Sequence, residues 1–305
     1  MNLMKYRNWF YIVSAIFVSL GIIAIVLWGL LPSIDFTGGS KIELRGTNNK
    51  DKAYEFADKN ELNGAVVQPI GDDGLSIRFE EISEEKHREI TEKISDFFGA
   101  GVTEVGFETV GPTISREITR NAFILVGLAS LVIILYIAYS FRRVPKPVSS
   151  WEFGMMAIVA LFHDAVIVIG AFAFLGEFFK VEVDPLFVTG VLTVISFSVH
   201  DTVVIFDRIR ENLIKRGASN LEETVNLSIL EMIPRTITTS FLVWAILLIL
   251  FLFGGTTIRY FVLTLLIGVI VGAYSSPLVA APLLITWQEF KDKKLNSNGL
   301  KKKLG

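Results

Sequence analysis

The sequence predicts a polytopic α-helical membrane protein with six transmembrane helices and one α+β domain outside the cytoplasm. Three observations lead to this fold class. Hydrophobic residues make up 51% of the 305 residues, which does not suit a water-soluble chain. The apolar residues form six runs that approach the ~20 residues needed to cross ~30 Å of hydrocarbon. Basic residues gather in short connections, whereas acidic residues concentrate between Asp51 and Glu108.

Each apolar run predicts one membrane-spanning helix. The first begins behind Lys5 and Arg7, as a signal peptide would, but no small-residue cleavage site follows it, so we expect a retained helix. The fifth run is the shortest and gives the weakest signal. The runs cover residues 10–31, 118–140, 153–175, 186–206, 236–253 and 260–287.

The basic residues predict the orientation of these helices. If every run spans, the basic groups near the N-terminus, at 142–146, at 208–216 and in the tail 291–303 all lie on one side. The positive-inside rule assigns that side to the cytoplasm, so both termini are expected there. The predicted domains are the N-terminus with the first helix (1–34), an extracytoplasmic domain (35–116), the remaining five helices (117–287) and a basic cytoplasmic tail (288–305).

The segment 35–116 has a soluble composition and an alternating pattern of strands and helices. Its βαββαβ order predicts a ferredoxin-like sandwich, in which two helices cover one face of four antiparallel strands. Ser83 is the expected N-cap of the second helix, and residues 71–74 are the expected turn of the central hairpin. The predicted strands are 41–45, 65–70, 75–80 and 102–110, and the predicted helices are 52–59 and 83–98.

Ionisable residues within the apolar runs are the main functional signal. A charged group near mid-membrane costs ~2.5 to 3.5 kcal/mol on insertion scales, so it needs a partner or a function. His163 and Asp164 lie near the centre of the third run, where Asp164 continues a stripe of alanines at helical spacing. A stripe of small residues predicts a face that packs on another helix rather than on lipid.

The fourth run carries a second set of polar residues. Helical spacing places Ser198, Asp201 and Arg208 on one face, and His200 and Asp207 on a neighbouring face. Asp201 is expected inside the inner half of the membrane, whereas Asp207 and Arg208 can reach the interface. The carboxylates either pair with neighbours and hold the bundle together, or change their charge as part of an ion pathway.

Polar residues in the last two runs leave similar alternatives. Arg235 follows Pro234 at the start of the fifth run, where it either snorkels to headgroups or pairs with an acid. Thr239 donates either across helices or to its own backbone. In the sixth run Gly268 and Gly272 form a GxxxG pattern that favours close helix packing. Tyr274 opens a segment, ending at Pro277, that is expected to break this helix locally, and Pro282 is expected to repeat the break.

Two short segments outside the membrane join the domain to its helices. Asp35, Gly38 and Gly39 follow the first helix, and Gly111 and Pro112 precede the second. We interpret them as an outer hinge, and a simple flexible turn is the alternative interpretation.

Several classes of protein are not expected. The sequence has no cysteine, which excludes a disulfide, a thiolate metal site and a cysteine nucleophile. It has no His-Glu-x-x-His and no Gly-x-Ser-x-Gly segment, so neither an enzyme nor a metal site is predicted. Because the uneven charge indicates topology, no nucleic-acid partner is predicted.

The motifs resemble those of the SecF family of bacterial protein-export membrane proteins, along almost the whole chain. The matching segments are Ile34 to Gly39, Val110 to Pro112, His163-Asp164, Ser198 to Asn212, Arg235 to Ser240 and Gly272 to Pro277. The resemblance implies a member of the resistance-nodulation-division superfamily in the bacterial cytoplasmic membrane. It also implies that the chain pairs with SecD and acts beside the SecYEG channel on preproteins. The implied energy source is the proton motive force, and no cofactor is implied.

The same resemblance assigns residues. The intramembrane aspartate of the family matches Asp201, and its companion arginine matches Arg235, so these two are expected to carry proton passage, with sodium as an alternative coupling ion. His163 and Asp164 match another motif of the family. His200 stands where the family usually has asparagine. A proton-driven exporter of small molecules or lipids, and a passive scaffold for the channel, are the alternative functions.

Overall fold

The computed structural model describes residues 2–304 except 72, 143, 145–147 and 217–219. Arg143 and Lys146, two of the basic residues used for the orientation, lie outside the described residues, as does Asp72 of the predicted hairpin turn. The side chains of Arg216 and of the tail beyond residue 294 also lie outside the described part.

The chain forms two compact units. The first combines Met1–Leu30, Val126–Glu177 and Leu186–Gly305, and the second combines Leu31–Leu125 with Phe178–Pro185. The second unit therefore includes the short connection after the third apolar run, which the sequence did not assign to the outer domain.

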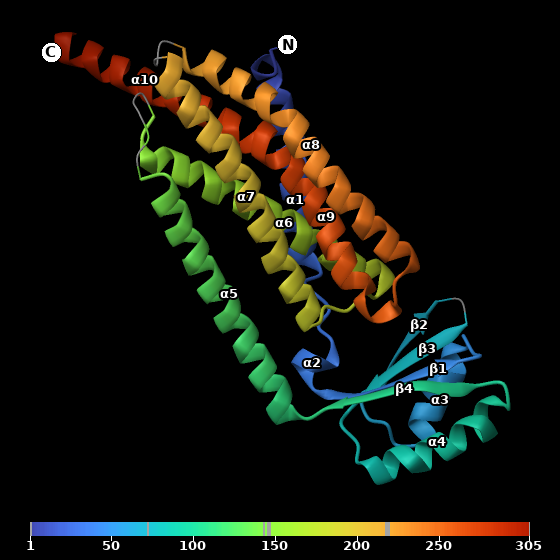
Figure 1. The fold of residues 1–305 in the computed structure, drawn as a ribbon. Coiled ribbons are helices and arrows are strands. Elements are labelled where there is room, and N and C mark those ends of the chain that lie inside the picture. Colours follow the sequence, from blue (N-terminus) through green and yellow to red (C-terminus); the bar gives the residue numbers. More distant parts are fainter. Residues whose placement is uncertain (1, 72, 143, 145–147, 217–219, 305) are drawn as a thin grey trace. The chain divides into compact units, whose positions relative to one another are not determined.

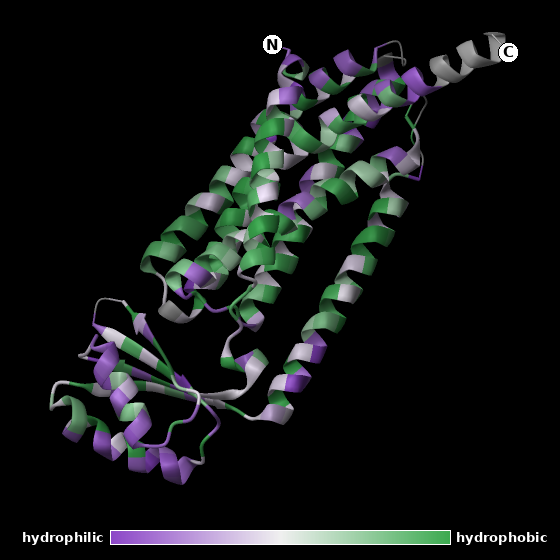
Figure 2. Ribbon diagram, turned by 180° about the vertical axis from the view of Figure 1, so that it is seen from behind, coloured by the Kyte–Doolittle hydropathy of each residue, from purple (hydrophilic) through white to green (hydrophobic). Residues whose placement is uncertain are grey.

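Six helices among the described residues are long and apolar enough to cross a membrane, one for each predicted run. Their surfaces are largely hydrophobic, as Figure 2 shows, which fits helices surrounded by lipid. In chain order they are α1 (Arg7–Leu27, after a 3-10 turn at Met4–Tyr6), α5 (Pro112–Ser140), α6 (Ser150–Phe179), α7 (Pro185–Arg216), α8 (Leu221–Phe253), and α9 (Arg259–Ser275, after a 3-10 turn at Thr256–Ile258) continued by α10 (Ala281–Leu304).

The start of α8 differs from the prediction. The helix begins at Leu221, because the Asn220 side chain caps it by accepting from the Glu223 N–H at 3.2 Å. Its first turns bury Val225 and Ile229, so an amphipathic segment precedes the apolar one. Arg235 thus lies inside a continuous helix, directly before the apolar run that begins at Thr236.

The last span changes its helical form at the first expected break, near Pro277, whereas the second break, expected at Pro282, was wrong. After α9 ends at Ser275, the chain continues through a π-helical segment, Ser276–Ala280, directly into α10. A π-helical turn widens the helix by an extra residue and so accommodates a proline without ending the helix. Pro282 lies in the first turn of α10, where a missing N–H costs little.

Close packing holds the first unit together. The rings of Phe141, Phe153 and Phe206 meet pairwise, with centroids 5.0 to 5.6 Å apart. A methyl group added at Gly268 of α9 would lie 2.0 Å from the Val194 side chain of α7, so this glycine allows the two helices to approach, as the GxxxG pattern predicted.

The second unit contains a four-stranded antiparallel sheet in the order β2-β3-β1-β4, with α3 and α4 against one face (Figure 1). Phe56 and Ile90 of the helices pack on Ile42 and Ile77 of the strands. Ser83 caps α4 as predicted, because its hydroxyl accepts from the Lys86 N–H at 3.3 Å. The elements are α2 (Ile34–Thr37), β1 (Gly39–Arg45), α3 (Lys50–Lys59), β2 (Val66–Ile70), β3 (Gly74–Phe79), α4 (Glu84–Phe98) and β4 (Thr103–Val110).

The connection between α6 and α7 is fastened to this unit. The Ser33 N–H donates to the Val183 carbonyl at 2.9 Å, and the Val183 N–H donates to the Leu31 carbonyl at 2.8 Å. Glu182 pairs with Arg78 of β3 at 3.3 Å. Burial raises the pKa of the Glu182 carboxyl, and the Arg78 guanidinium only partly opposes this effect.

Candidate functional site

His163 and Asp164 lie on the buried face of α6. The Asp164 side chain is fully buried, and His163 is nearly so. Two of the alanines in the predicted stripe, Ala157 and Ala160, are buried as well, so this face packs on other helices as the spacing predicted. The site therefore begins from a carboxylate that has no contact with lipid or water.

Hydrogen bonds join Asp164 and His163 to three other helices. Asp164 Oδ1 lies 2.7 Å from His163 Nδ1, and Ser14 Oγ of α1 lies 2.6 Å from His163 Nε2. Ser275 Oγ of α9 donates to Asp164 Oδ2 at 2.9 Å, and Ser198 Oγ of α7 donates to the same oxygen. With the proton of a neutral imidazole on Nδ1, the carboxylate accepts from three donors, which is a fully satisfied arrangement.

The contacts of Tyr274 support this network. Its hydroxyl lies 3.4 Å from His163 Nε2, and its ring stands edge-on to the imidazole with centroids 5.8 Å apart. Sequence reasoning identified Tyr274, His163, Asp164 and Ser198 but missed Ser14 and Ser275. A lone serine in an apolar run carries no signal of its own, because serine is common at packed helix interfaces.

Asp201 lies one turn after Ser198 on α7, and its environment differs from that of Asp164. It is half-buried and borders a cavity of about 230 Å³ between α7, α8 and α9. Within the described part of the chain, no side chain forms a hydrogen bond or an ion pair with the Asp201 carboxyl group. Ser198 borders the same cavity and also donates to Asp164. Its hydroxyl therefore lies between Asp164 and the cavity of Asp201.

Arg235 of α8 borders this cavity as well, together with His200. Both side chains are exposed on the surface of the single chain. Among the described residues, no carboxylate lies within ion-pairing distance of the Arg235 guanidinium. The cavity is therefore bordered by a carboxyl group, that of Asp201, and a permanent cation, that of Arg235, which are not directly bonded to each other.

Thr239 resolves one of the alternatives that the sequence left open. Its hydroxyl donates to the backbone carbonyls of Arg235 and Thr236 at 3.0 and 3.1 Å, so it bonds within its own helix. Such back-bonding bends helices slightly. Pro234, one residue before Arg235, also removes a backbone donor from this turn.

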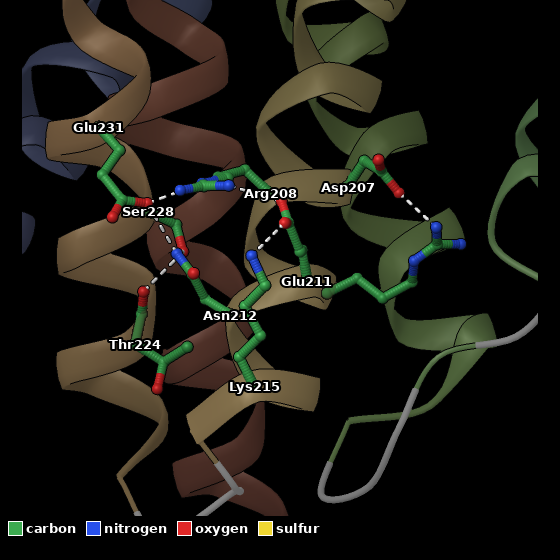
Figure 3. A network of polar contacts seen from close by, with 9 residues as sticks. Asp207, Arg208, Glu211, Asn212, Lys215, Thr224, Ser228 and Glu231 are labelled. Atoms are coloured by element: carbon green, nitrogen blue, oxygen red, sulfur yellow. Dashed lines mark hydrogen bonds and ion pairs between the residues drawn. The ribbon is translucent and has the colours of Figure 1, made fainter.

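Asp207 and Arg208 belong to a separate ionic network near the end of α7, which Figure 3 shows. Arg208 pairs with Glu211 at 2.5 Å and with Glu231 of α8 at 2.7 Å. Asp207 pairs with Arg210 at 2.6 Å. These pairs are satisfied locally, and neither residue borders the cavity of Asp201.

The two predicted hinge segments lie side by side in the second unit. Gly38 and Gly39 have φ angles of 75° and 122°, a region that favours glycine. Gly39 pairs with Val110 across the sheet, which brings Gly111 and Pro112 next to it. A Cβ on Gly39 would lie 2.6 Å from the Phe79 carbonyl oxygen. Asp35 accepts from the Ser33 hydroxyl at 3.0 Å.

No group of three or more potential metal-ligating side chains occurs among the described residues. The side chains gathered around Asp164 and Asp201 carry carboxylate, imidazole, hydroxyl and guanidinium groups.

These features define a multi-pass membrane protein with ionisable groups buried in its helix bundle. Comparison with known proteins gives the family. The model described as "Protein export membrane protein SecD/SecF, C-terminal" matches residues 90–290. The chain belongs to the SecD/SecF family of protein-export membrane proteins, in its SecF branch, and has a SecF-like role in protein export.

The similarity to curated relatives covers almost the full length. The chain is 40% identical to protein translocase subunit SecF of Thermobaculum terrenum and 36% identical to that of Anaerolinea thermophila, over 94% of each chain in both cases. Among solved structures, SecDF from Thermus thermophilus is similar with a TM-score of 0.82 and 29% identity over 95% of this chain. The chain spans 39% of that SecDF chain.

Proposed function

We propose that this chain couples proton flow across the bacterial cytoplasmic membrane to preprotein export, with Asp201 as the group that takes up and releases the proton. The observation that carries the proposal is the cavity that Asp201 shares with Arg235. A carboxyl group without a fixed bond, beside a permanent cation, can change its charge at low structural cost.

The contrast with Asp164 supports this choice of residue. Asp164 accepts from His163, Ser198 and Ser275, and protonation would disrupt those bonds. Asp201 has no such bonds to lose. We therefore assign Asp164 and His163 to positioning the helices, and Asp201 to proton passage, with His200 and Arg235 setting the local field.

The energy available is sufficient for a conformational change. Each proton that crosses supplies ~2.3 kcal/mol per 100 mV, which is comparable with typical allosteric coupling energies. Sodium is the alternative coupling ion. Because α7 starts at Pro185, directly after the connection fastened to the second unit, movement of α7 has a short covalent path to that unit.

The proposed setting follows from the relatives. The chain spans only part of the SecDF chain, so we propose that a SecD-like subunit supplies the remainder and that both work beside SecYEG on preproteins. We place both termini in the cytoplasm and the second unit outside it, as a ferredoxin-like domain whose strand order supports that name. Gly38 and Gly39 with Gly111 and Pro112 would form the hinge.

Export into membrane vesicles tests the proposal. We expect Asp201→Asn to abolish the stimulation of preprotein export by a proton gradient, while the variant still inserts and co-purifies with its SecD-like partner. Asp292→Asn is the matched control, since it makes the same charge change at an exposed position. Full stimulation in Asp201→Asn would reject the proton role and leave a passive scaffold as the better function.

A further inference from the structure

A second space lies between α5, α7 and α8 near the charged end of α7. Its volume is about 570 Å³, and it is bordered by residues of the network in Figure 3. Its lining combines arginines with apolar side chains. The arginines are Arg142, Arg208, Arg210 and Arg235, and the apolar side chains are Tyr139, Phe141, Val203, Val204 and Met232.

The charges in this pocket do not balance. Among the described residues that border it, four guanidinium groups stand against three carboxylates, those of Asp207, Glu211 and Glu231, an excess of one positive charge. Arg208 and Arg210 are paired. Arg142 and Arg235 have no carboxylate within 4 Å in the described part of the chain. The pocket is therefore suited to an anion with an apolar portion.

Arg142 is held in a fixed orientation. Its guanidinium lies over the Tyr139 ring, 3.9 Å from the centroid, and donates to the Tyr139 carbonyl at 3.0 Å. An arginine fixed by stacking keeps its remaining N–H donors aimed outward, so less entropy is lost when it binds a phosphate.

We propose that this pocket binds the phosphodiester headgroup of an anionic phospholipid between Arg142 and Arg235. The headgroup would neutralise the excess charge, and the first methylene groups of the acyl chains would pack on the apolar side chains. Basic pockets between transmembrane helices bind anionic headgroups by this combination. Because Arg235 borders both spaces, a bound phosphate would compete with Asp201 for its guanidinium.

Native mass spectrometry of the purified full chain tests the proposal, with phosphatidylglycerol and phosphatidylcholine as probes. We expect the chain to bind phosphatidylglycerol preferentially. Arg142→Gln should lower this affinity about tenfold, because one charge-assisted hydrogen bond is lost. Lys5→Gln, which removes a charge outside the pocket, should bind like the unmodified chain, and Arg142→Lys should retain the preference for the anionic lipid.

Three results would overturn the proposal. The first is equal phosphatidylglycerol binding by Arg142→Gln and the unmodified chain. The second is full displacement of the lipid by inorganic phosphate at the same concentration, which would identify a site for the free anion. The third is a photo-crosslinker at position 142 that captures only a polypeptide in intact membranes, which would identify a protein segment as the occupant. Arg142 is exposed, so its variants should fold normally, which thermal unfolding verifies.

Discussion

Two aspartates in this helix bundle look alike in sequence but differ in their surroundings. Asp164 is fully buried and bonded to His163, Ser198 and Ser275, whereas Asp201 borders a cavity and has no bonded side-chain partner among the residues that the structure describes. A bonded buried carboxylate is a structural element, and an unbonded one is free to titrate. The difference between the two acids is the basis of the proposed division of roles.

This difference predicts that replacing Asp164 lowers the stability of the folded chain, whereas replacing Asp201 does not. In Asp164→Asn, the three donors would meet an NH₂ group, which cannot accept a hydrogen bond, and an amide oxygen, which accepts more weakly than a carboxylate. We therefore expect this variant to lower the free energy of unfolding by roughly 1 to 3 kcal/mol. Asp201→Asn breaks no bond in the described chain and should leave stability almost unchanged. Thermal unfolding of the purified variants, followed by tryptophan fluorescence, measures both. Equal unfolding midpoints for the two variants would show that the network around Asp164 does not stabilise the bundle.

The sequence could not separate these two residues. It identified both acids, His163 and Ser198 from their position and spacing. However, Ser14 reaches His163 across 149 positions of the chain, and Ser275 reaches Asp164 across 111. Periodicity along one helix reports which face is packed, but not which hydroxyl on another helix meets it.

At the scale of elements, the connection between α6 and α7 is the most consequential feature. Its backbone bonds to residues 31–33, and Glu182 reaches Arg78. The sequence showed only a short loop between two apolar runs. A single pair of backbone hydrogen bonds has no sequence pattern, so its place in the second unit could not be predicted.

Protonation of Glu182 should tighten this attachment. Burial raises the pKa of Glu182 in the folded chain, so the ionised carboxylate costs stability at neutral pH, and this cost disappears as the pH falls through the raised pKa. Hydrogen exchange of segment 178–185, corrected for the intrinsic effect of pH, should therefore slow as the pH falls from neutral through the raised pKa of Glu182. The effect should be absent in Glu182→Gln and preserved in Glu92→Gln, an exposed control. The same pH response in Glu182→Gln would contradict the assignment.

Elements with strong local patterns were predicted well. The order of strands and helices in the second unit, the Ser83 cap and one long apolar helix for each run all follow from periodicity and capping. Helix ends were predicted poorly where polar, amphipathic turns extend an apolar run, as in α8. Pro277 marks the change to a π-helical turn, which accommodates it without ending the span, and Pro282 was misleading because α10 continues through it.

At the scale of the whole molecule, α7 connects the proposed proton site at Asp201 to the second unit of the chain. α7 carries Asp201 at its middle and starts at Pro185. Export would follow if a change in the charge of Asp201 alters its interaction with Arg235 and shifts α7. The central claim is thus that Asp201 is the acid in the bundle that changes its charge.

Infrared difference spectroscopy of the purified chain across a pH change tests this claim most directly, because a protonated carboxyl group shielded from water has its own C=O stretching band. We predict that this band rises on acidification in the unmodified chain and in Asp292→Asn, whereas Asp201→Asn lowers the rise by the contribution of one carboxyl group and leaves that of the buried Glu182 carboxyl. A band of full intensity in Asp201→Asn would contradict the account, since another group would then be the one that takes up the proton.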